Sequence, residues 1–360
     1  MSLPPSMRAL VLRAPRQFAV EDVPVPTALD PDDVLCRVHT TFICGTDPHI
    51  INGDYPGFWP PAFPFIPGHE WSAEVVETGT RARALGWKAG DRVCAISHCG
   101  CGVCRNCLRG RYNLCLNYGK AEAGHRQYGH ITPGAYADYV KASVKSLVRV
   151  PAGFDLELSA CVDPLSIALY TVKRSRLQPG DDLLVMGTGP QGLMAILVGT
   201  ALGAGRILAV GSGARLALAE KLGAIAIDYR QGHVVERISE MTNGLGVPAV
   251  LECAGTAQSI RDCCLAAAKG GVVSVIGIPQ DEPQLPMRRI VLDEIEIVGD
   301  RANPNTAEAA LDLLVNERID LTPLLTHRFS LADFATALET FETRKDGAVK
   351  VAIKPGGLAA

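Results

Sequence analysis

The sequence predicts an α/β protein in two parts, an all-β part followed by a parallel sheet covered by helices on both faces. Up to about residue 151 the chain consists of short β-like runs separated by glycine and proline, which is typical of an irregular antiparallel barrel. From about residue 165 to residue 299 apolar strands alternate with helical periods, which is typical of a doubly wound parallel sheet. A chain of 360 residues with 48% hydrophobic residues is long enough to build both cores.

The individual elements follow from alternation of apolar residues and from turn signals. In the first part we expect strands at 7–12, 34–40, 73–77, 92–96 and 136–140. In the second part we expect strands at 182–186, 206–210, 249–253 and 271–276, with helices that begin at Pro190 and Ala214 and near Ile260. The final stretch predicts a helix around 307–314 and a strand over 348–353.

Charge and hydropathy argue against nucleic-acid and membrane partners. The 35 Lys and Arg residues nearly balance the 38 Asp and Glu residues, and both signs are mixed along the chain. No segment offers about 18 uncharged apolar residues, and the N-terminus has no signal-like apolar run. We therefore expect a cytoplasmic protein without nucleic-acid or membrane partners. Its twelve cysteines, five of them at 99–115, then indicate metal binding rather than disulfides.

A glycine-rich turn joins the expected strand at 182–186 to the helix that follows. The turn consists of Gly187, Thr188, Gly189, Pro190, Gln191 and Gly192. Glycines in this place allow a tight turn and close backbone approach, while the N-terminus of the helix offers free N–H groups to a pyrophosphate. The turn predicts a dinucleotide-binding unit, and an ordinary strand-to-helix turn is the alternative.

The sequence after the second strand of this unit bears on the choice between NADP and NAD. NAD-binding units carry a carboxylate here for the ribose 2′-hydroxyl, but this chain has Gly211 and Ser212, with Arg215 close behind. Gly211 makes room, Ser212 can donate a hydrogen bond, and Arg215, with Arg230 as a second candidate, supplies positive charge to a 2′-phosphate. We favour NADP. The alternative is NAD, with Arg215 a solvated helix residue.

Four cysteines in one short segment predict a structural zinc site. They are Cys101, Cys104, Cys107 and Cys115. Four thiolates complete a tetrahedral coordination sphere and leave no position open for substrate. Cys99 is a fifth thiol that can exchange with Cys101, and a set of reduced or redox-active thiols is the alternative.

Further motifs are dispersed, and together they resemble a known family. One motif contains Cys44, Thr46 and Asp47, a second contains His69 and Glu70, and a third contains Asp163. Any one of these residues, taken alone, would more often be a packed core residue. With the four-cysteine segment, the glycine-rich turn and the segments 90–93 and 134–139, they resemble the motif set of the zinc-dependent medium-chain alcohol dehydrogenases. The resemblance covers nearly the whole chain.

The resemblance implies a division of the chain and a role for each matching residue. It implies a GroES-like catalytic domain over 1–164 with its zinc lobe at 99–115, a Rossmann domain over 165–300, and a return to the catalytic domain over 301–360. It implies that Cys44, His69 and Asp163 bind a catalytic zinc, that Glu70 is an exchangeable or outer ligand, and that Asp47 orients the histidine. Lys350 is assigned to the cofactor pyrophosphate, and an exposed strand lysine is the alternative.

Two departures from the family pattern affect the substrate prediction. Ala73 stands where the family signature usually has glycine. Asp163 resembles the third ligand of bacterial NADP-dependent secondary-alcohol enzymes, but those enzymes usually lack the four-cysteine lobe, and the segment 163–166 also resembles polyol dehydrogenases.

The chemistry implied is hydride transfer between a small-molecule alcohol or ketone and NADP or NAD. Zinc acts as a Lewis acid on the alcohol oxygen. The proton can pass from the alcohol through the hydroxyl of Thr46, the cofactor ribose and the imidazole of His49 to solvent, and an ordinary surface imidazole is the alternative for His49. The aromatic segment 55–65 favours a bulky or cyclic secondary alcohol.

Three alternatives remain for the function. One is a polyol or sugar-alcohol dehydrogenase that uses NAD. The others are a non-catalytic nucleotide-binding relative and a zinc-free reductase of the same superfamily. Family habit also predicts a homodimer or homotetramer.

Overall fold

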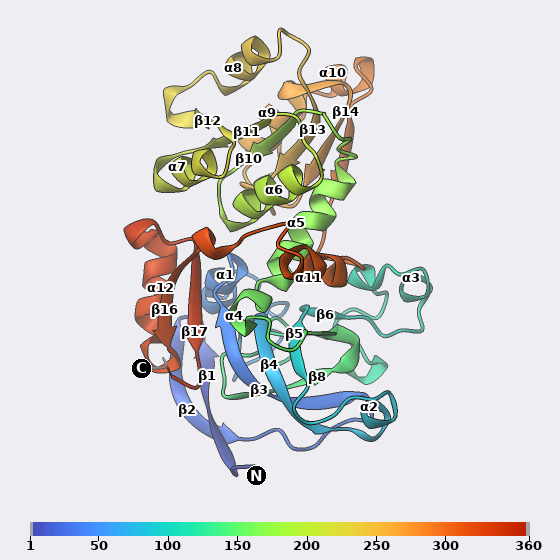
Figure 1. Cartoon of the computed structure of the whole chain (residues 1–360), viewed down its shortest axis with the longest axis vertical. Helices are drawn as coiled ribbons and strands as arrows, with labels where there is room; N and C mark the ends of the chain where they lie inside the picture. The colour runs from blue at the N-terminus through green and yellow to red at the C-terminus, as the bar shows by residue number, and fades with distance from the viewer. Residues whose placement is uncertain (1–2, 358–360) are drawn as a thin grey trace. The chain divides into compact units, whose positions relative to one another are not determined.

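The computed structural model describes residues 3–357 (Figure 1). The chain forms two compact units. Unit 1 comprises the chain up to Asp163, Ala307–Val315 and the chain from Leu325 onward, and unit 2 comprises Pro164–Thr306 and Asn316–Leu324. The domain limits expected from the sequence, after residues 164 and 300, stay predictions. Within residues 3–357, no helix has both the length and the apolar composition to cross a bilayer.

Unit 1 is built around a seven-stranded sheet. The strands run in the order β16-β17-β3-β4-β5-β9, with β8 also paired to β3, and every pair except the parallel β16–β17 pair is antiparallel. They are β3 (Asp33–Phe42), β4 (Glu70–Thr78), β5 (Arg92–Ala95), β8 (Tyr139–Ser143), β9 (Leu147–Arg149), β16 (Leu325–Ser330) and β17 (Lys350–Lys354).

Two small sheets and several helices complete unit 1. The small sheets pair β1 (Ser6–Ala14) with β2 (Gln17–Pro24), and β6 (His98–Cys99) with β7 (Arg126–Gln127). The helices are α1 (Thr46–Asn52), α2 (Thr80–Ala84), α3 (Arg105–Leu108), α4 (Leu156–Ser159), α11 (Ala307–Val315) and α12 (Phe334–Thr343). Apolar residues of β1, α1, α12 and β17 form one core, and those of β3, β4 and β5 form another.

One expected strand of unit 1 begins later than the sequence suggested. The run at 136–140 becomes β8 only from Tyr139, because the N–H of Tyr136 donates to the carbonyl of Pro67 at 3.1 Å instead of joining the sheet. The all-β interpretation of this part of the chain is wrong where α1, α2 and α3 interrupt the strands.

Unit 2 contains a six-stranded sheet in which every pair is parallel, as the sequence predicted. The order is β12-β11-β10-β13-β14-β15. The strands are β10 (Leu183–Met186), β11 (Ile207–Gly211), β12 (Ile225–Asp228), β13 (Val247–Glu252), β14 (Ala267–Val275) and β15 (Glu296–Gly299). The chain first runs outward from β10 and then returns to β13 on its other side, so β10 and β13 mark the switch point at which such sheets bind ligands.

Helices accompany the strands of unit 2 in alternation. They are α5 (Val162–Arg174), α6 (Pro190–Ala201), α7 (Gly213–Lys221), α8 (Val234–Met241), α9 (Ala257–Ala266) and α10 (Met287–Leu292). Helix α6 packs on β10 and β11, α7 on β11 and β12, and α9 on β13 and β14 (Figure 1). The central strands β10 and β13 are mostly apolar because helices cover them, as in other parallel sheets.

Candidate metal and cofactor sites

Three potential metal ligands meet where the end of β3 lies beside the start of β4. Phe42 of β3 lies opposite Glu70 of β4, so Cys44, two residues beyond β3, comes next to His69. One ligand atom each from Cys44, His69 and Glu70 lies within 4.8 Å of the others, and both His69 and Glu70 are buried. A thiolate, an imidazole and a carboxylate are the donors that zinc prefers, so this donor set fits a zinc ion.

The carboxylate of Asp47 contacts the Nδ1 side of the His69 imidazole. Its Oδ1 lies 3.5 Å from Nδ1 of His69, while its Oδ2 accepts hydrogen bonds from Cys44 N at 2.8 Å and from the Tyr136 hydroxyl at 2.6 Å. Burial alone would raise the pKa of Asp47, but His69 and these donors keep it below its ordinary value. This arrangement leaves Nε2 of His69 as the atom that faces the other ligands, the tautomer that a metal requires.

The surroundings of His69 favour a positive charge at this place. Burial lowers the pKa of His69, yet the charges of Asp47 and Cys44 outweigh it and raise that pKa well above its ordinary value. A group of acidic and thiol side chains of this kind also suits a divalent cation.

Helix α1 carries the two residues assigned to proton transfer. Thr46 is its first residue, and Thr46 Oγ1 lies 3.4 Å from Nε2 of His69. His49 follows three positions later, which places it on the same side of the helix. The Nδ1 atom of His49 is 2.6 Å from Oδ2 of Asp54, a partner that the sequence analysis missed.

Asp163 is buried but lies outside the group formed by Cys44, His69 and Glu70. Its Oδ1 accepts a hydrogen bond from the backbone N–H of Ser97 at 2.9 Å, and its side chain is 1% exposed. Among the described residues, the ligand atoms that lie together are those of the other three side chains. The assignment of Asp163 as a zinc ligand stays a prediction.

Lys350 is buried in unit 1, and its ammonium donates to Oε2 of Glu70. Lys350 is only 1% exposed, so the alternative that it is an exposed strand lysine is wrong. The assignment of Lys350 to the cofactor pyrophosphate stays a prediction. No sequence signal indicated the Glu70 pair, since the two residues are 280 positions apart.

A chain of aromatic rings connects the segment 55–65 with His69. Trp59 is buried and contacts the rings of Tyr55 and His130, with centroids at 5.2 and 4.8 Å. The ring of His130 lies 4.4 Å from that of His69. Tyr118 adds a polar link, because Trp59 Nε1 donates to its hydroxyl at 2.7 Å. The aromatic segment is therefore linked to His69 through the ring of His130.

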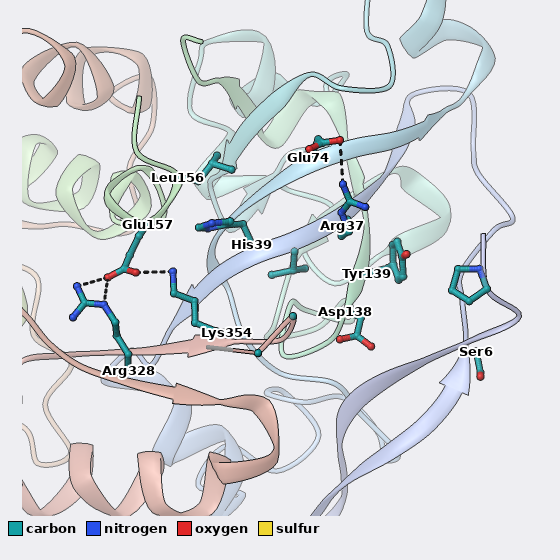
Figure 2. A pocket seen from close by; sticks show the side chains of 14 residues that line it. Ser6, Arg37, His39, Glu74, Asp138, Tyr139, Leu156, Glu157, Arg328 and Lys354 are labelled. Atoms are coloured by element: carbon teal, nitrogen blue, oxygen red, sulfur yellow. Dashed lines mark hydrogen bonds and ion pairs between the residues drawn. The ribbon is translucent and has the colours of Figure 1, made fainter. Parts of the chain in front are cut away.

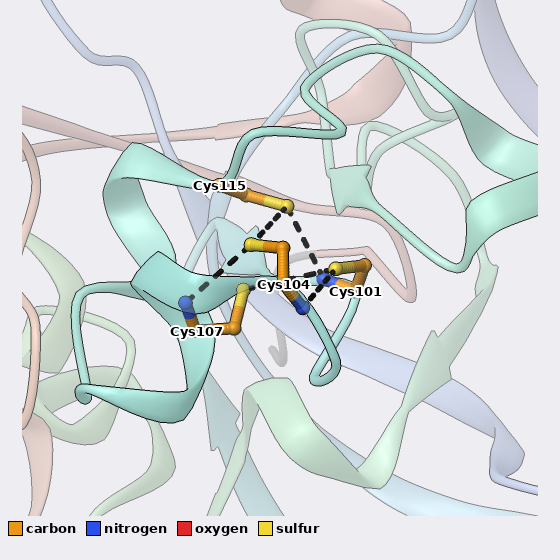
Figure 3. A group of neighbouring side chains, drawn as sticks. All are labelled: Cys101, Cys104, Cys107 and Cys115. Atoms are coloured by element: carbon orange, nitrogen blue, oxygen red, sulfur yellow. Dashed lines mark hydrogen bonds between the residues drawn. The ribbon is translucent and has the colours of Figure 1, made fainter.

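The four-cysteine lobe brings its sulfur atoms together (Figure 3). Sγ of Cys101 lies 3.9 Å from Sγ of Cys107, and Sγ of Cys104 lies 3.9 Å from Sγ of Cys115. Zinc–sulfur bonds of about 2.3 Å in a tetrahedron place the sulfurs roughly 3.8 Å apart, so the arrangement fits a zinc ion. Burial opposes ionisation of Cys101, but N–H donors, that of Val103 first, lower its pKa to about 6, which favours the thiolate.

The glycine-rich turn of unit 2 has the geometry that a pyrophosphate needs. Position 192 requires glycine because a Cβ there would lie 1.8 Å from the carbonyl oxygen of Gly187. Position 187 requires glycine because its φ of +109° lies in a region that other residues rarely adopt. A Cβ on Gly189, the N-cap of α6, would meet nothing within 4 Å, and the space above the helix terminus is open. Oε1 of Gln191 is buried without a hydrogen-bond partner among the described residues. These features fit a bound dinucleotide.

The segment after β11 provides polar groups. Ser212 Oγ donates to the Tyr229 hydroxyl at 3.3 Å. The guanidinium of Arg230 pairs with the carboxylate of Asp228, and Arg215 lies in the first turn of α7. The assignment of these arginines to a 2′-phosphate stays a prediction. Gly211 has a further reason to be glycine, because a Cβ there would lie 2.0 Å from Thr188 Oγ1.

A separate groove of about 690 Å³ lies on the outer side of β3 in unit 1 (Figure 2). Most of its charged side chains pair with one another, and Asp138 pairs with Arg8. Arg328 and Lys354 converge on Glu157 at 2.7 and 2.6 Å, and Arg37 pairs with Glu74 at 3.2 Å. These pairs join β16, β17 and α4, so the groove is assigned a structural role.

Comparisons with known proteins cover both parts of the chain. Residues 30–152 match the family model described as alcohol dehydrogenase GroES-like domain, and residues 190–316 match the one described as zinc-binding dehydrogenase. The sorbitol dehydrogenase of Bacillus subtilis is 32% identical over 98% of this chain and 99% of its own length. An L-threonine 3-dehydrogenase of Bacillus velezensis is 33% identical over 92% of this chain and 94% of its own.

Solved structures share the fold over the same extent. A protein of Sinorhizobium meliloti described as a zinc-binding dehydrogenase, solved bound to NADP, superposes with a TM-score of 0.88 and is 29% identical. The match covers 97% of this chain and 99% of that one. The GroES-like and Rossmann-type architecture expected from the sequence is confirmed.

Proposed function

Because the chain belongs to the zinc-dependent medium-chain alcohol dehydrogenases, we propose that it interconverts a bulky or cyclic secondary alcohol and its ketone, with NADP as the preferred cofactor. One observation carries the proposal. The buried group of Cys44, His69 and Glu70 in unit 1 occurs together with a dinucleotide turn in unit 2. The first supplies a cation site and the second a cofactor site, and the reaction needs both.

The residues of unit 1 prepare the alcohol for reaction. Zinc held by these residues would supply a Lewis acid that lowers the pKa of the alcohol hydroxyl, and a nicotinamide would supply the hydride acceptor. Asp47 keeps His69 in the tautomer that can bind the ion. The hydroxyl of Thr46 accepts the proton that the alcohol loses and donates its own onward, and His49 passes a proton to solvent.

Two features support a bulky or cyclic substrate. The rings of Trp59 and His130 lie in sequence against His69, and Phe58 adds a partly exposed ring that stacks on Trp59 at 5.1 Å. Such rings offer a large apolar contact area to a substrate carbon skeleton. NADP is supported by Ser212 and Arg215 and by the absence of a carboxylate immediately after β11.

A polyol or sugar alcohol with NAD is the second candidate. The similarity to the Bacillus subtilis sorbitol dehydrogenase favours it, and so does the polar link from Trp59 through Tyr118 to Gln127. A hydroxylated substrate needs such donors and acceptors.

One experiment separates these candidates. The zinc-loaded enzyme is assayed by nicotinamide absorbance with cyclohexanol, 2-octanol, sorbitol and L-threonine, each with NADP and with NAD. The proposal expects the highest kcat/KM with a cyclic or long secondary alcohol and NADP. A highest value for sorbitol with NAD supports the second candidate, and turnover of none of the four contradicts both.

A measurement of zinc content tests the proposed pair of ions, one catalytic and one structural. A homodimer or homotetramer and a location in the cytoplasm stay predictions.

A further inference from the structure

We propose that Asp54 is a positioning residue that fixes the tautomer of His49 and so completes the route by which the substrate proton leaves. The inference rests on the proposed function, because it concerns proton transfer during alcohol oxidation. Its basis is the 2.6 Å contact between Nδ1 of His49 and Oδ2 of Asp54. A distance this short is typical of hydrogen bonds in which one partner is charged.

The C-terminal turn of helix α1 places Asp54 beside His49. Gly53 ends the helix in the left-handed conformation, with a φ of 76°. The backbone N–H of Asp54 then donates to the carbonyl of His49 at 3.0 Å. A side chain at position 53 would strain this turn and would place a Cβ 2.7 Å from Pro15 Cγ, so the turn requires glycine. Asp54 is therefore tied to His49 through its backbone as well as its carboxylate.

The chemistry follows from what each group can donate. A neutral imidazole has one N–H and one nitrogen lone pair, and a carboxylate can only accept. Asp54 therefore keeps the proton on Nδ1 and leaves the lone pair of Nε2 free. When Nε2 takes up a proton from the relay that starts at Thr46, the ring becomes an imidazolium and the carboxylate of Asp54 stays ionised beside it.

The proton balance closes without any further reactant. The same proton leaves Nε2 for water, which returns the ring to its starting tautomer, and no electrons move. Water can reach this point because the side chains of His49 and Asp54 are 38% and 40% exposed. Exposed ion pairs contribute little to stability, so the effect of Asp54 should be found in proton transfer rather than in folding.

The first test reads the tautomer directly and does not depend on activity. The full-length protein is labelled with ¹⁵N-histidine, and the ring signals of His49 are identified by their loss in His49→Gln. At alkaline pH we expect the Nδ1–H tautomer in the wild type and the Nε2–H tautomer in Asp54→Ala. Asp22→Asn, which changes an exposed carboxylate on β2, is the control and should leave the signals in place. An Nε2–H tautomer in the wild type overturns the proposal.

The second test is a double-mutant cycle on kcat with the best alcohol from the substrate panel. We expect Asp54→Asn to lower kcat by about tenfold, a part of the effect that positioned proton transfer usually has, and to leave the KM for the alcohol unchanged. In the His49→Gln background the same substitution should have no further effect. An equal loss in both backgrounds, or an unchanged kcat, overturns the proposal. If the wild type oxidises no alcohol, the proposed function fails, while the tautomer measurement still decides whether Asp54 positions His49.

Discussion

The ammonium of Lys350 donates a hydrogen bond to Oε2 of Glu70, the residue that directly follows His69. Both side chains are 1% exposed. One oxygen of Glu70 is thus paired with a buried cation. The pair explains how a carboxylate can stay buried beside Cys44 and His69, since a buried charge needs a partner.

Lys350→Met should destabilise the protein because it leaves the carboxylate of Glu70 buried without its cation. Loss of one partner of a buried ion pair costs about 3–5 kcal/mol, and we expect a decrease of that order in the free energy of unfolding measured with urea. The double variant Glu70→Gln with Lys350→Met should recover part of the loss. A single variant as stable as the wild type would show that the pair has no such role.

The third ligand of the catalytic zinc can be identified by metal analysis. The family resemblance assigns Asp163, whereas Glu70 lies with Cys44 and His69 in the structure. We expect Asp163→Asn to lose the catalytic zinc and to keep the zinc of the cysteine lobe, because an amide is a poor substitute for a carboxylate ligand. Glu70→Gln should keep both ions, because the carboxylate of Glu70 is already paired with the ammonium of Lys350 and the resemblance makes Glu70 an exchangeable or outer ligand. The reverse pattern would assign the position to Glu70.

The cysteine lobe should depend on its metal for order. Cys104→Ser removes one of four ligands, and structural zinc contributes about 10–16 kcal/mol to small metal-dependent folds. We expect loss of the structural zinc and rapid proteolysis within residues 99–115. Cys99→Ser is the matched control, because Cys99 lies outside the group of four sulfurs. A Cys104→Ser lobe that resists protease as the wild type does would contradict a metal-dependent fold.

Arg215 should set the preference for NADP. Hydrogen bonds to charged groups contribute about 1.5–3 kcal/mol, so Arg215→Ala should lower kcat/KM for NADP by about tenfold or more and change the value for NAD little. Lys221→Ala, in the last turn of the same helix, serves as the control. Equal losses with both cofactors would mean that Arg215 does not recognise the 2′-phosphate.

Glu252, at the end of β13, should make stability depend on pH. Burial raises its pKa above the ordinary value of 4.5, although Ser259 and two backbone N–H groups donate to Oε1. Folding thus favours the protonated carboxyl, and this contribution is lost as the pH rises through the folded-state pKa. Relative to Glu252→Gln, the wild type should lose free energy of unfolding as the pH rises above the ordinary glutamate pKa of 4.5. A constant difference in urea unfolding would contradict the assignment.

The sequence predicted those parts of the fold and site that depend on neighbouring residues. The glycine-rich turn between β10 and α6 could be recognised because its spacing sets its conformation. The four cysteines could be recognised because their metal geometry is determined within one short loop. The ends of the strands were less well predicted. At Tyr136, for example, a backbone hydrogen bond to Pro67 replaces pairing within the sheet.

Contacts between distant segments could not be predicted in this way. The sequence by itself determined that the protein has a nucleotide-binding turn and a cysteine lobe, because each is encoded by local spacing and backbone preference. Only the tertiary structure decided that Lys350 pairs with Glu70, that Asp47 contacts His69, and that the ring of His130 links the aromatic segment to the ring of His69. Those contacts depend on strand register and on side-chain packing, which bring together residues that no local pattern relates.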